Sequence, residues 1–293
     1  MRVYKGSSYA EAYKNALQGL RDDPEYDVSP RGQRVKEIQD VSIEVEDPSL
    51  CLFTNERRSS QLKYIAAELL YYFSGRNDVG FISKYAKLWE TIANPNGTVN
   101  SAYGTLLFRD KNEYDLNQWE WAYQSLAKDK DTRQAVMFFN KPTFQFFDNK
   151  DFVCTLNGVF SIRDNKLNFT VQMRSNDAVL GTATDDAFFC LLQLQMLKQL
   201  KENVYPDLEL GTYTHIVHSL HIYERHFDLV DEMLEYKFEP MSFPSIREFF
   251  ITPQGHATSI LKELEQGIET EGKSDLRGSK DDPLFNWIIN QIL

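Results

Sequence analysis

The sequence contains few cysteines: only three stand among its 293 residues, at positions 51, 154 and 190. This odd number and these spacings match neither a disulfide framework nor a zinc site. Free thiols are typical of a reducing compartment, and we expect a cytoplasmic protein. The first residues carry no apolar signal core, and no apolar run reaches membrane-spanning length, so no membrane partner is expected.

Positive charge is also scarce. The 32 Lys and Arg residues are outnumbered by 43 Asp and Glu, which leaves a formal net charge of −11. An acidic surface repels duplex nucleic acid, so direct nucleic-acid binding is disfavoured, and a small anionic substrate would need a local cluster of arginines. Hydrophobic residues make up 42% of the chain, with 20 Phe, 15 Tyr and 4 Trp, which predicts an ordered core in one large or two small domains.

Periodicity and capping patterns predict a mixture of helices and strands. A capping box at residues 8–11 opens a helix that ends near residue 19, and a second helix over 59–74 ends at Gly75. Residues 272–282 are typical of a solvated linker, and the apolar tail 283–293 should dock on the core or on a partner. Further helices are predicted at 185–200 and 228–234, and strands at 35–45, 134–139, 144–147, 152–162, 167–173 and 215–220.

Glu68 is a candidate for proton handling. It lies beside the apolar stripe of the predicted helix 59–74, one turn from Tyr64 and Tyr72. A carboxyl group held among aromatic rings has its neutral form favoured, which suits proton transfer. The alternative is an ordinary surface glutamate, which helical spacing alone would favour.

Cys154 is a candidate nucleophile because of the predicted hairpin formed by strands 152–162 and 167–173. A turn centred on Asp164 places Cys154 opposite Arg174, and a slip of one residue pairs it with Ser175 instead. In either register a guanidinium lies near the sulfur, and an adjacent cation lowers the pKa of a thiol. A buried structural cysteine is an equally weighted alternative.

Two further clusters carry polar chemistry. Arg174 and Ser175 offer a guanidinium fork and a hydroxyl that could grip a phosphate, with a surface arginine as the alternative. His215, His218 and His221 repeat every three residues, which would focus them on a metal if they lay on a helix. The predicted strand turns 215 and 221 to one face and 218 to the other, so no metal site is expected.

Asp185 and Asp186 stand at the start of a predicted helix. Either could be the N-cap, which is a common structural role. The functional alternative is a carboxylate at the mouth of a pocket, where it recognises the donor-bearing edge of a base.

Taken together, these segments resemble the thymidylate synthase family over residues 31–231, with six landmarks in the family's order. The landmarks are the helix with its glutamate (68–75), the tryptophan followed by Tyr-Gly (Trp89, Tyr103, Gly104), the motif 131–133, Cys154, the signature 173–181 and the His-x-Tyr of His221 and Tyr223. The resemblance implies an α+β fold in a single domain over 1–293, with a large mixed sheet flanked by helices. It also implies a sheet-mediated homodimer and a divergent helical region and tail over 236–293.

Within the family, the closer resemblance is to the phage deoxycytidylate hydroxymethylases, carried by the runs 100–104, 154–155, 162–164, 173–177 and 220–227. Thymidylate synthases have a histidine after the nucleophile and a second tryptophan after the first, where Thr155 and Ile92 stand here. The resemblance implies conversion of dCMP and the co-substrate 5,10-methylenetetrahydrofolate, with water, to 5-hydroxymethyl-dCMP and tetrahydrofolate. The setting it implies is nucleotide biosynthesis for DNA modification in the cytoplasm of a phage-infected bacterium.

The resemblance also implies a role for each site residue. Cys154 would attack C6 of the pyrimidine, while Glu68 and Tyr103 would manage proton transfers. The phosphate would be held by Arg174, Ser175, Arg31 (with Arg34 as the alternative) and, from the partner subunit, Arg133. The ribose would contact His221 and Tyr223, and the folate would contact Trp89, Asp177 and Gly181. The family's second arginine after Arg133 is absent, since Gln134 stands there.

Asp185 is the most informative departure from thymidylate synthases, which have an asparagine at this position. A protonated Asp185 would accept from N4 of cytosine and donate to N3, with helix capping as a secondary role. A site built for one base edge rejects another by about 10⁴-fold, so Asp185 favours dCMP. The alternatives are a dUMP hydroxymethylase, a dCMP or dUMP methyltransferase including thymidylate synthase, and a non-catalytic nucleotide- or RNA-binding protein on the same scaffold.

Overall fold

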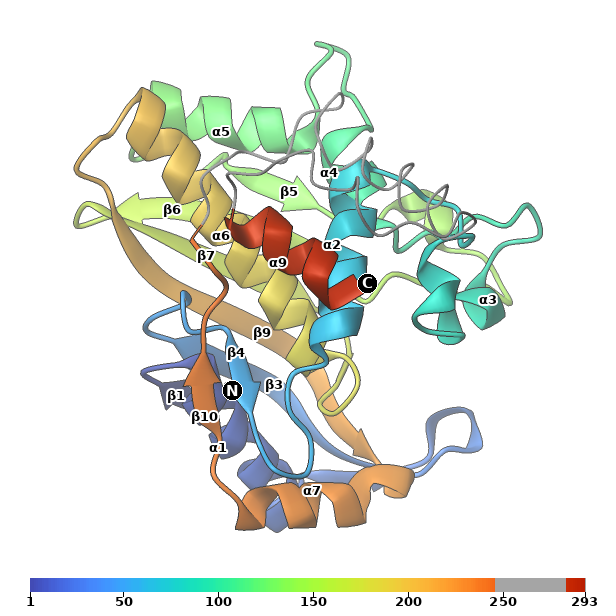
Figure 1. The fold of residues 1–293 in the computed structure, drawn as a ribbon. Coiled ribbons are helices and arrows are strands. Elements are labelled where there is room, and N and C mark those ends of the chain that lie inside the picture. The colour runs from blue at the N-terminus through green and yellow to red at the C-terminus, as the bar shows by residue number, and fades with distance from the viewer. Residues whose placement is uncertain (246–282, 293) are drawn as a thin grey trace. The chain divides into compact units, whose positions relative to one another are not determined.

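The computed structural model describes residues 1–245 and 283–292. The chain forms two compact units: the first comprises Met1–Ser60, Tyr123–Val136 and Cys154–Phe243, and the second Gln61–Ala122, Met137–Val153 and Pro244–Leu293. The elements in Figure 1 are β1 (Arg2–Gly6), α1 (Tyr9–Asp22), β2 (Tyr26–Val28), β3 (Val35–Val45), β4 (Leu52–Thr54), α2 (Leu62–Ser74), α3 (Leu88–Ile92), α4 (Tyr103–Phe108), α5 (Gln118–Lys128), β5 (Val136–Phe138), β6 (Thr155–Arg163), β7 (Lys166–Met173), β8 (Asn176–Asp177), α6 (Thr182–Asn203), β9 (Glu209–Tyr223), α7 (Phe227–Glu235), β10 (Glu239–Met241) and α9 (Pro283–Ile292).

A mixed sheet forms the centre of the first unit. Five of its strands follow the order β1, β3, β9, β7, β6, with β1–β3 and β7–β9 parallel and β3–β9 and β6–β7 antiparallel. In addition, β2 pairs with β3 and β8 pairs with β9. The helix α1 packs on β1 and β3, and α6 packs on β7 and β9. The predicted α+β class with a large mixed sheet flanked by helices is therefore confirmed, while the single-domain boundaries over 1–293 stay a prediction.

The strand β3 explains an irregular pattern in the sequence. Its apolar residues are spaced by both two and three, yet Ile38, Val41 and Ile43 are all buried. Asp40 adopts a left-handed conformation with φ of 52°, and it lies exposed between them. The left-handed residue interrupts the regular alternation of the strand, and side chains spaced by two and by three are both buried, so the predicted strand 35–45 is confirmed.

The hairpin of β6 and β7 places Cys154 opposite Arg174, as predicted, although its turn differs from the predicted one. Asp164 and Asn165 both have positive φ, as a two-residue type I′ turn requires, and they place Arg163 opposite Lys166. That register alone would pair Cys154 with Ser175. An irregularity between Thr155 and Asn157 shifts the register by one residue, so that Thr155 pairs with Met173 and the Arg174 amide donates to the Cys154 carbonyl at 2.9 Å.

The second unit is built on α2, which is buried continuously from Ile65 to Ser74 and ends at Gly75, as predicted. The apolar tail helix α9 packs against α2, with Leu284 and Ile288 buried. The tail therefore docks within its own chain, which was one of the two predicted outcomes. The predicted linker 272–282 lies outside the described residues.

Two sequence predictions are wrong. Residues 144–147 are not a strand, because Pro142 starts a 3₁₀ turn and the Asn149 side chain donates to the Phe144 carbonyl at 2.7 Å, leaving Phe147 fully exposed. Neither Asp185 nor Asp186 is a helix N-cap. The helix α6 begins earlier, with Gly181 as its N-cap, and the Asp185 amide already donates to the Gly181 carbonyl at 2.9 Å.

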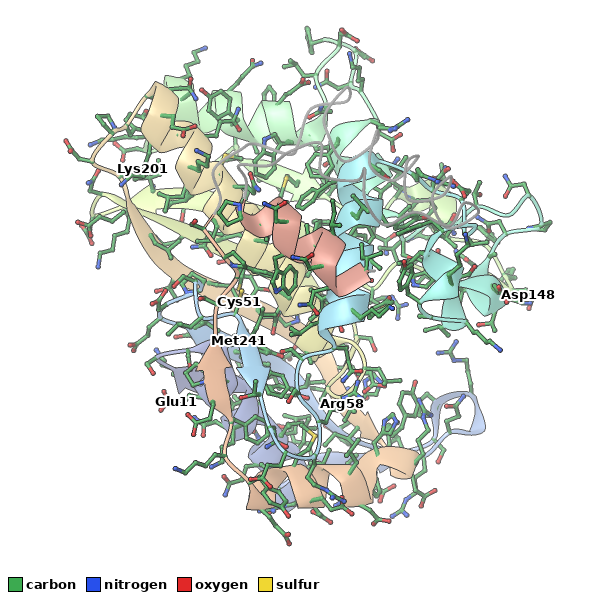
Figure 2. All side chains as sticks on the ribbon, viewed as in Figure 1. Glu11, Cys51, Arg58, Asp148, Lys201 and Met241 are labelled. Atoms are coloured by element: carbon green, nitrogen blue, oxygen red, sulfur yellow. The ribbon has the colours of Figure 1, made fainter. Side chains whose placement is uncertain are left out.

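A small second sheet in the first unit joins β4 to β10, with Met241 opposite Leu52. Cys51, immediately before β4, is completely buried, and Figure 2 labels both Cys51 and Met241. Cys190 on α6 is equally buried, so these two cysteines belong to the core, as expected for Cys190.

A close backbone approach explains the Tyr-Gly pair at the start of α4. A Cβ atom on Gly104 would lie 1.7 Å from the Tyr72 carbonyl oxygen of α2, so only glycine fits.

We expect Gly104→Ala to lower the free energy of unfolding by about 3 kcal/mol, because the two helices must separate. Gly97→Ala is the control: its φ is 77° but no atom lies within 4 Å of the added Cβ, so backbone strain alone should cost about 1 kcal/mol. Equal losses of the two variants in urea denaturation would contradict the close approach.

Candidate active site

The first unit brings Cys154 and Arg174 together. A guanidinium nitrogen of Arg174, Nη2, donates to Cys154 Sγ at 3.4 Å, and Cys154 is only partly buried. The register of the hairpin makes this contact, since the two residues are bonded through their backbones as well. A positive charge in contact with sulfur stabilises the thiolate relative to the thiol. The sulfur is therefore placed as an activated nucleophile requires, and its catalytic role remains a proposal.

Asp185 lies in the first turn of α6 and is partly exposed. Loss of hydration raises the pKa of Asp185 to about 7; Asp186 raises it further, while His215 and the hydrogen bond from Asn176 oppose the rise. The Asn176 side chain donates to Asp185 Oδ2 at 3.3 Å. A carboxyl group with this pKa is about half neutral near pH 7, and in that form it can donate and accept a hydrogen bond at the same time.

A buried polar cluster stands behind Asp185, and the sequence did not reveal it. Asn176 Nδ2 lies 3.1 Å from His215 Nε2, and His215 Nδ1 lies 3.0 Å from Asp186 Oδ1. The Tyr213 hydroxyl donates to the same Asp186 oxygen at 2.9 Å. One signal pointed to it: Tyr213 and His215 are polar side chains at alternate positions of a strand whose inward face is otherwise apolar.

The three strand histidines differ in burial. His215 is completely buried and His221 nearly so, whereas His218 is exposed and lies 2.8 Å from Asp40. The rings of His221 and Tyr223 meet edge to face at 5.1 Å, and the Arg225 guanidinium covers the Tyr223 ring at 4.1 Å. Among residues 1–245 and 283–292, no group of three or more His, Cys, Asp or Glu side chains could hold a metal ion.

The candidate phosphate arginines differ in their surroundings. Arg34 binds Asp27 at 2.7 Å and Glu224 at 2.6 Å, so both ends of its guanidinium are engaged. Arg31 lies exposed in the 3₁₀ turn Pro30–Gly32, with φ of 52°. Arg133 is exposed in the segment after α5, and Ser175 is partly buried next to Arg174. These surroundings favour Arg31 over Arg34 as an anion ligand.

The loop between β8 and α6 is tightly organised around Asp177. Its Oδ1 accepts from the Val179 amide at 2.8 Å and the Leu180 amide at 3.2 Å, while the Asp177 carboxylate stays partly exposed. A Cβ atom on Gly181 would lie 2.2 Å from Asn176 Oδ1. The glycine therefore lets Asn176 occupy its place beside Asp185.

Glu68 forms the centre of an aromatic cluster in the second unit. It is 6% exposed, and the hydroxyls of Tyr64 and Tyr72 donate to its Oε1 at 2.8 and 3.2 Å. Trp89 Nε1 donates to the Tyr64 hydroxyl at 2.9 Å, and the Tyr103 ring stacks on Tyr72 at 5.1 Å. Glu68 is therefore not the surface residue of the alternative interpretation. Four separate predictions, Glu68, Trp89, Tyr103 and the flanking tyrosines, meet in one cluster.

Each unit thus gathers part of the predicted set. The first holds Cys154, Asp185, the rings of His221 and Tyr223 and the candidate phosphate ligands; the second holds Glu68 with Trp89 and Tyr103. In the part of the chain that the structure describes, no helix is long and apolar enough to cross a membrane.

Comparison with known proteins agrees with this geometry. The thymidylate synthase family model matches residues 12–257, a longer stretch than the motif-bearing segment 31–231. The deoxycytidylate 5-hydroxymethyltransferase of Enterobacteria phage T4 is 31% identical over 223 residues, covering 71% of this chain and 84% of that protein. The deoxyuridylate hydroxymethyltransferase of Bacillus phage SP01 is 31% identical over 232 residues, covering 76% of this chain and 59% of that protein. A deoxyuridylate hydroxymethyltransferase of Pseudomonas phage M6 is 25% identical over 194 residues.

A family match over most of the chain, together with relatives at this level of identity, establishes the class of the protein. The family uses methylenetetrahydrofolate as its co-substrate. The chain is an enzyme that belongs to the thymidylate synthase family.

Proposed function

We propose that this protein is a deoxycytidylate 5-hydroxymethyltransferase. The observation that carries the proposal is Asp185, a partly exposed carboxyl group whose pKa is raised by burial to about 7. Its neutral form presents one acceptor and one donor, which matches N4–H and N3 of cytosine. Uracil presents the reverse pattern, an acceptor at O4 and a donor at N3, so a neutral carboxyl in the same arrangement opposes it.

Cys154 would start the reaction. Addition of its thiolate to C6 of dCMP forms an S–C6 bond and makes C5 nucleophilic, and methylenetetrahydrofolate supplies the one-carbon unit. Over the whole reaction, the hydrogen on C5 is lost as a proton and replaced by CH₂OH, whose hydroxyl derives from water. The S–C6 bond then breaks and the thiolate is restored. The 3.4 Å contact with Arg174 supports this role, since a nearby cation favours the thiolate before and after the addition.

Proton transfers are assigned to Glu68, with Tyr103 in a supporting role. Glu68 Oε1 already accepts from two tyrosine hydroxyls, so one oxygen is fixed in place by Tyr64 and Tyr72. Such fixed geometry favours proton transfer at a defined position. Trp89 and Asp177 are proposed to contact the folate, with Gly181 keeping the adjoining loop close.

The phosphate is assigned to Arg174, Ser175 and Arg31, with Arg133 contributed by the other subunit of a homodimer. Planar guanidinium groups suit the tetrahedral anion, and the exposure of Arg31 and Arg133 supports their availability. His221 and Tyr223 are proposed to contact the sugar, since their rings pack as one unit.

Hydroxymethylation of dUMP is the second candidate. It is favoured by the deoxyuridylate hydroxymethyltransferase of phage SP01, which is as similar to this chain as the phage T4 protein. The two candidates share the thiol and the one-carbon donor, and they differ in the base edge that Asp185 meets.

Mass spectrometry of the product tests the proposal. We expect the protein to convert dCMP and methylenetetrahydrofolate to 5-hydroxymethyl-dCMP in H₂¹⁸O with one ¹⁸O atom incorporated, and to release tetrahydrofolate without dihydrofolate. An equimolar mixture of dCMP and dUMP should give the cytosine product almost alone. Formation of a methylated nucleotide with dihydrofolate would replace the proposal by a methyltransferase, and a uracil product would replace it by the second candidate.

A further inference from the structure

The cluster behind Asp185 has no part in the chemistry proposed so far, although it buries two ionisable side chains and a tyrosine hydroxyl. Asp186, His215 and Tyr213 are all completely buried on α6 and β9. Such groups are costly to bury unless they are hydrogen-bonded to one another. The side chain of Asn176 joins this cluster to the partly exposed Asp185 by hydrogen bonds.

The tautomer of His215 follows from its neighbours. Nδ1 lies 3.0 Å from Asp186 Oδ1 and 2.8 Å from the Tyr213 hydroxyl oxygen. A carboxylate oxygen can only accept, and the hydroxyl directs its hydrogen at that same oxygen, so Nδ1 carries a proton. The Tyr213 hydroxyl donates to the same oxygen and holds the carboxylate in place. A neutral His215 therefore presents the lone pair of Nε2 to Asn176.

The orientation of Asn176 follows from His215. An amide nitrogen only donates, and Asn176 Nδ2 lies 3.1 Å from His215 Nε2 and 3.3 Å from Asp185 Oδ2. It also lies 3.1 Å from Met173 Sδ, which is a weaker acceptor than a ring nitrogen or a carboxyl oxygen. Its two hydrogens satisfy the two stronger partners only if Nε2 and Oδ2 are both acceptors. When Asp185 is neutral, its proton must then sit on Oδ1.

We propose that His215, anchored by Asp186 and Tyr213, is a positioning residue for base recognition. It determines whether the nitrogen or the oxygen of the Asn176 amide points at Asp185. It thereby decides which oxygen of Asp185 donates and which accepts. This inference rests on the proposed role of Asp185, and it adds a determinant of base specificity that never touches the base.

The opposite state of the cluster shows the same coupling. A protonated His215 would direct an N–H at Asn176 Nδ2, so two donors would face each other and the amide would have to turn its oxygen inward. Asp185 Oδ2 would then meet an acceptor and would have to carry the proton itself. Burial lowers the pKa of His215, but the neighbouring carboxyl groups, Asp186 first and then Asp185, together raise it overall. The ionisable groups that face His215 are Asp185 and Asp186 from α6 and Tyr213 from β9.

Two substitutions of His215 test the roles of its two ring nitrogens one at a time. In His215→Gln the amide oxygen can replace Nε2 as the acceptor for Asn176, while the donor to Asp186 is lost. In His215→Asn the shorter amide can replace Nδ1 as the donor to Asp186, while Asn176 loses its acceptor. Both variants remove the ring and the charge that imidazole can carry, and they differ from each other by one methylene group.

The measurement is calorimetric binding of dCMP and of dUMP to the full chain without folate, so that it does not depend on turnover. We expect His215→Asn to lose about tenfold in the dCMP-to-dUMP affinity ratio, the effect of one misdirected hydrogen bond, and His215→Gln to keep the wild-type ratio. An unchanged ratio in folded His215→Asn, or equal losses in both variants, would overturn the inference.

The binding experiment also separates this inference from the proposed function. A wild-type protein that prefers dUMP would refute dCMP as the substrate, yet a ratio change confined to His215→Asn would still support the role of His215. A wild-type protein that binds neither nucleotide would overturn both.

A measurement on the unsubstituted protein covers the case in which His215→Asn does not fold. With ¹⁵N-labelled histidine, NMR at mildly alkaline pH should show His215 protonated at Nδ1 and accepting a hydrogen bond at Nε2. Tyr213→Phe, which removes only the hydroxyl, assists the assignment of the His215 resonances. A proton on Nε2 with a bare Nδ1 would overturn the inference.

Discussion

Cys154→Ser is expected to abolish release of tritium from [5-³H]dCMP, with a fall in rate of about 10⁴-fold or more. A serine hydroxyl is a far weaker acid than a thiol, so the guanidinium of Arg174 at 3.4 Å cannot produce an appreciable amount of the anion. Tritium leaves C5 only after a nucleophile has added to C6, so the assay reports the covalent step directly. Binding of dCMP itself should change little, because one atom is replaced by a smaller one.

Cys190→Ala is the matched control for the loss of a thiol. Cys190 is fully buried on α6, so its removal should lower stability while the folded protein retains tritium release. Full activity in Cys154→Ser, or equal loss of activity in both folded variants, would refute Cys154 as the nucleophile.

Asp185→Asn is expected to reverse the preference between dCMP and dUMP, with a change of about 10⁴-fold in the ratio of kcat/KM. Asparagine has the same shape as aspartic acid, but its amide can donate to O4 of uracil and accept from N3–H. It cannot transfer a proton to N3 of cytosine, because an amide N–H is not acidic, so turnover of dCMP should fall. Steady-state rates with each nucleotide measure the change, and an unaltered ratio would show that Asp185 does not read the base.

The pH dependence of binding gives an independent check on the same residue. The pKa of Asp185 is about 7 because burial disfavours its charge, and only the neutral form matches cytosine. Affinity for dCMP should therefore be constant below about pH 6 and fall about tenfold for each pH unit above about 8. Asp185→Asn has no such group, so its binding of dUMP should show no transition in this range. A flat dCMP profile for the unsubstituted protein would contradict a neutral Asp185.

Much of the fold was predictable because its elements carry strong local patterns. The helix α2 was bounded by Gly75 and marked by an apolar stripe, and β3 matched its predicted range of 35–45. The strand predicted at 144–147 failed because aromatic residues alone suggested it. Pro142 and the side-chain hydrogen bond of Asn149 determine a turn there, and such bonds are not visible in a pattern of hydrophobicity.

The pairing of Cys154 with Arg174 was predicted from a turn centred on Asp164, whereas the turn in the structure is centred between Asp164 and Asn165. The two-residue turn at Asp164 and Asn165 would have moved the partner to Ser175, and the irregularity near Leu156 moved it back. A bulge has no reliable signature in a single sequence, because it depends on what the strand packs against. In either register the guanidinium of Arg174 lies close to the sulfur of Cys154. The inference about the thiol therefore did not depend on where the turn was placed.

The sequence by itself determined the family, the identity of the chemical groups and the face of each element on which they lie, because motif order and periodicity are properties of the chain alone. Only the tertiary structure decided the electrostatics of those groups. Glu68 could have been a surface residue until two tyrosine hydroxyls were found on one of its oxygens, and Asp185 could have been a helix cap until α6 was found to begin at Gly181. The link from Asp186 through His215 and Asn176 to Asp185 joins segments far apart in the chain, and hydration, charge and hydrogen bonding depend on such neighbours rather than on sequence position.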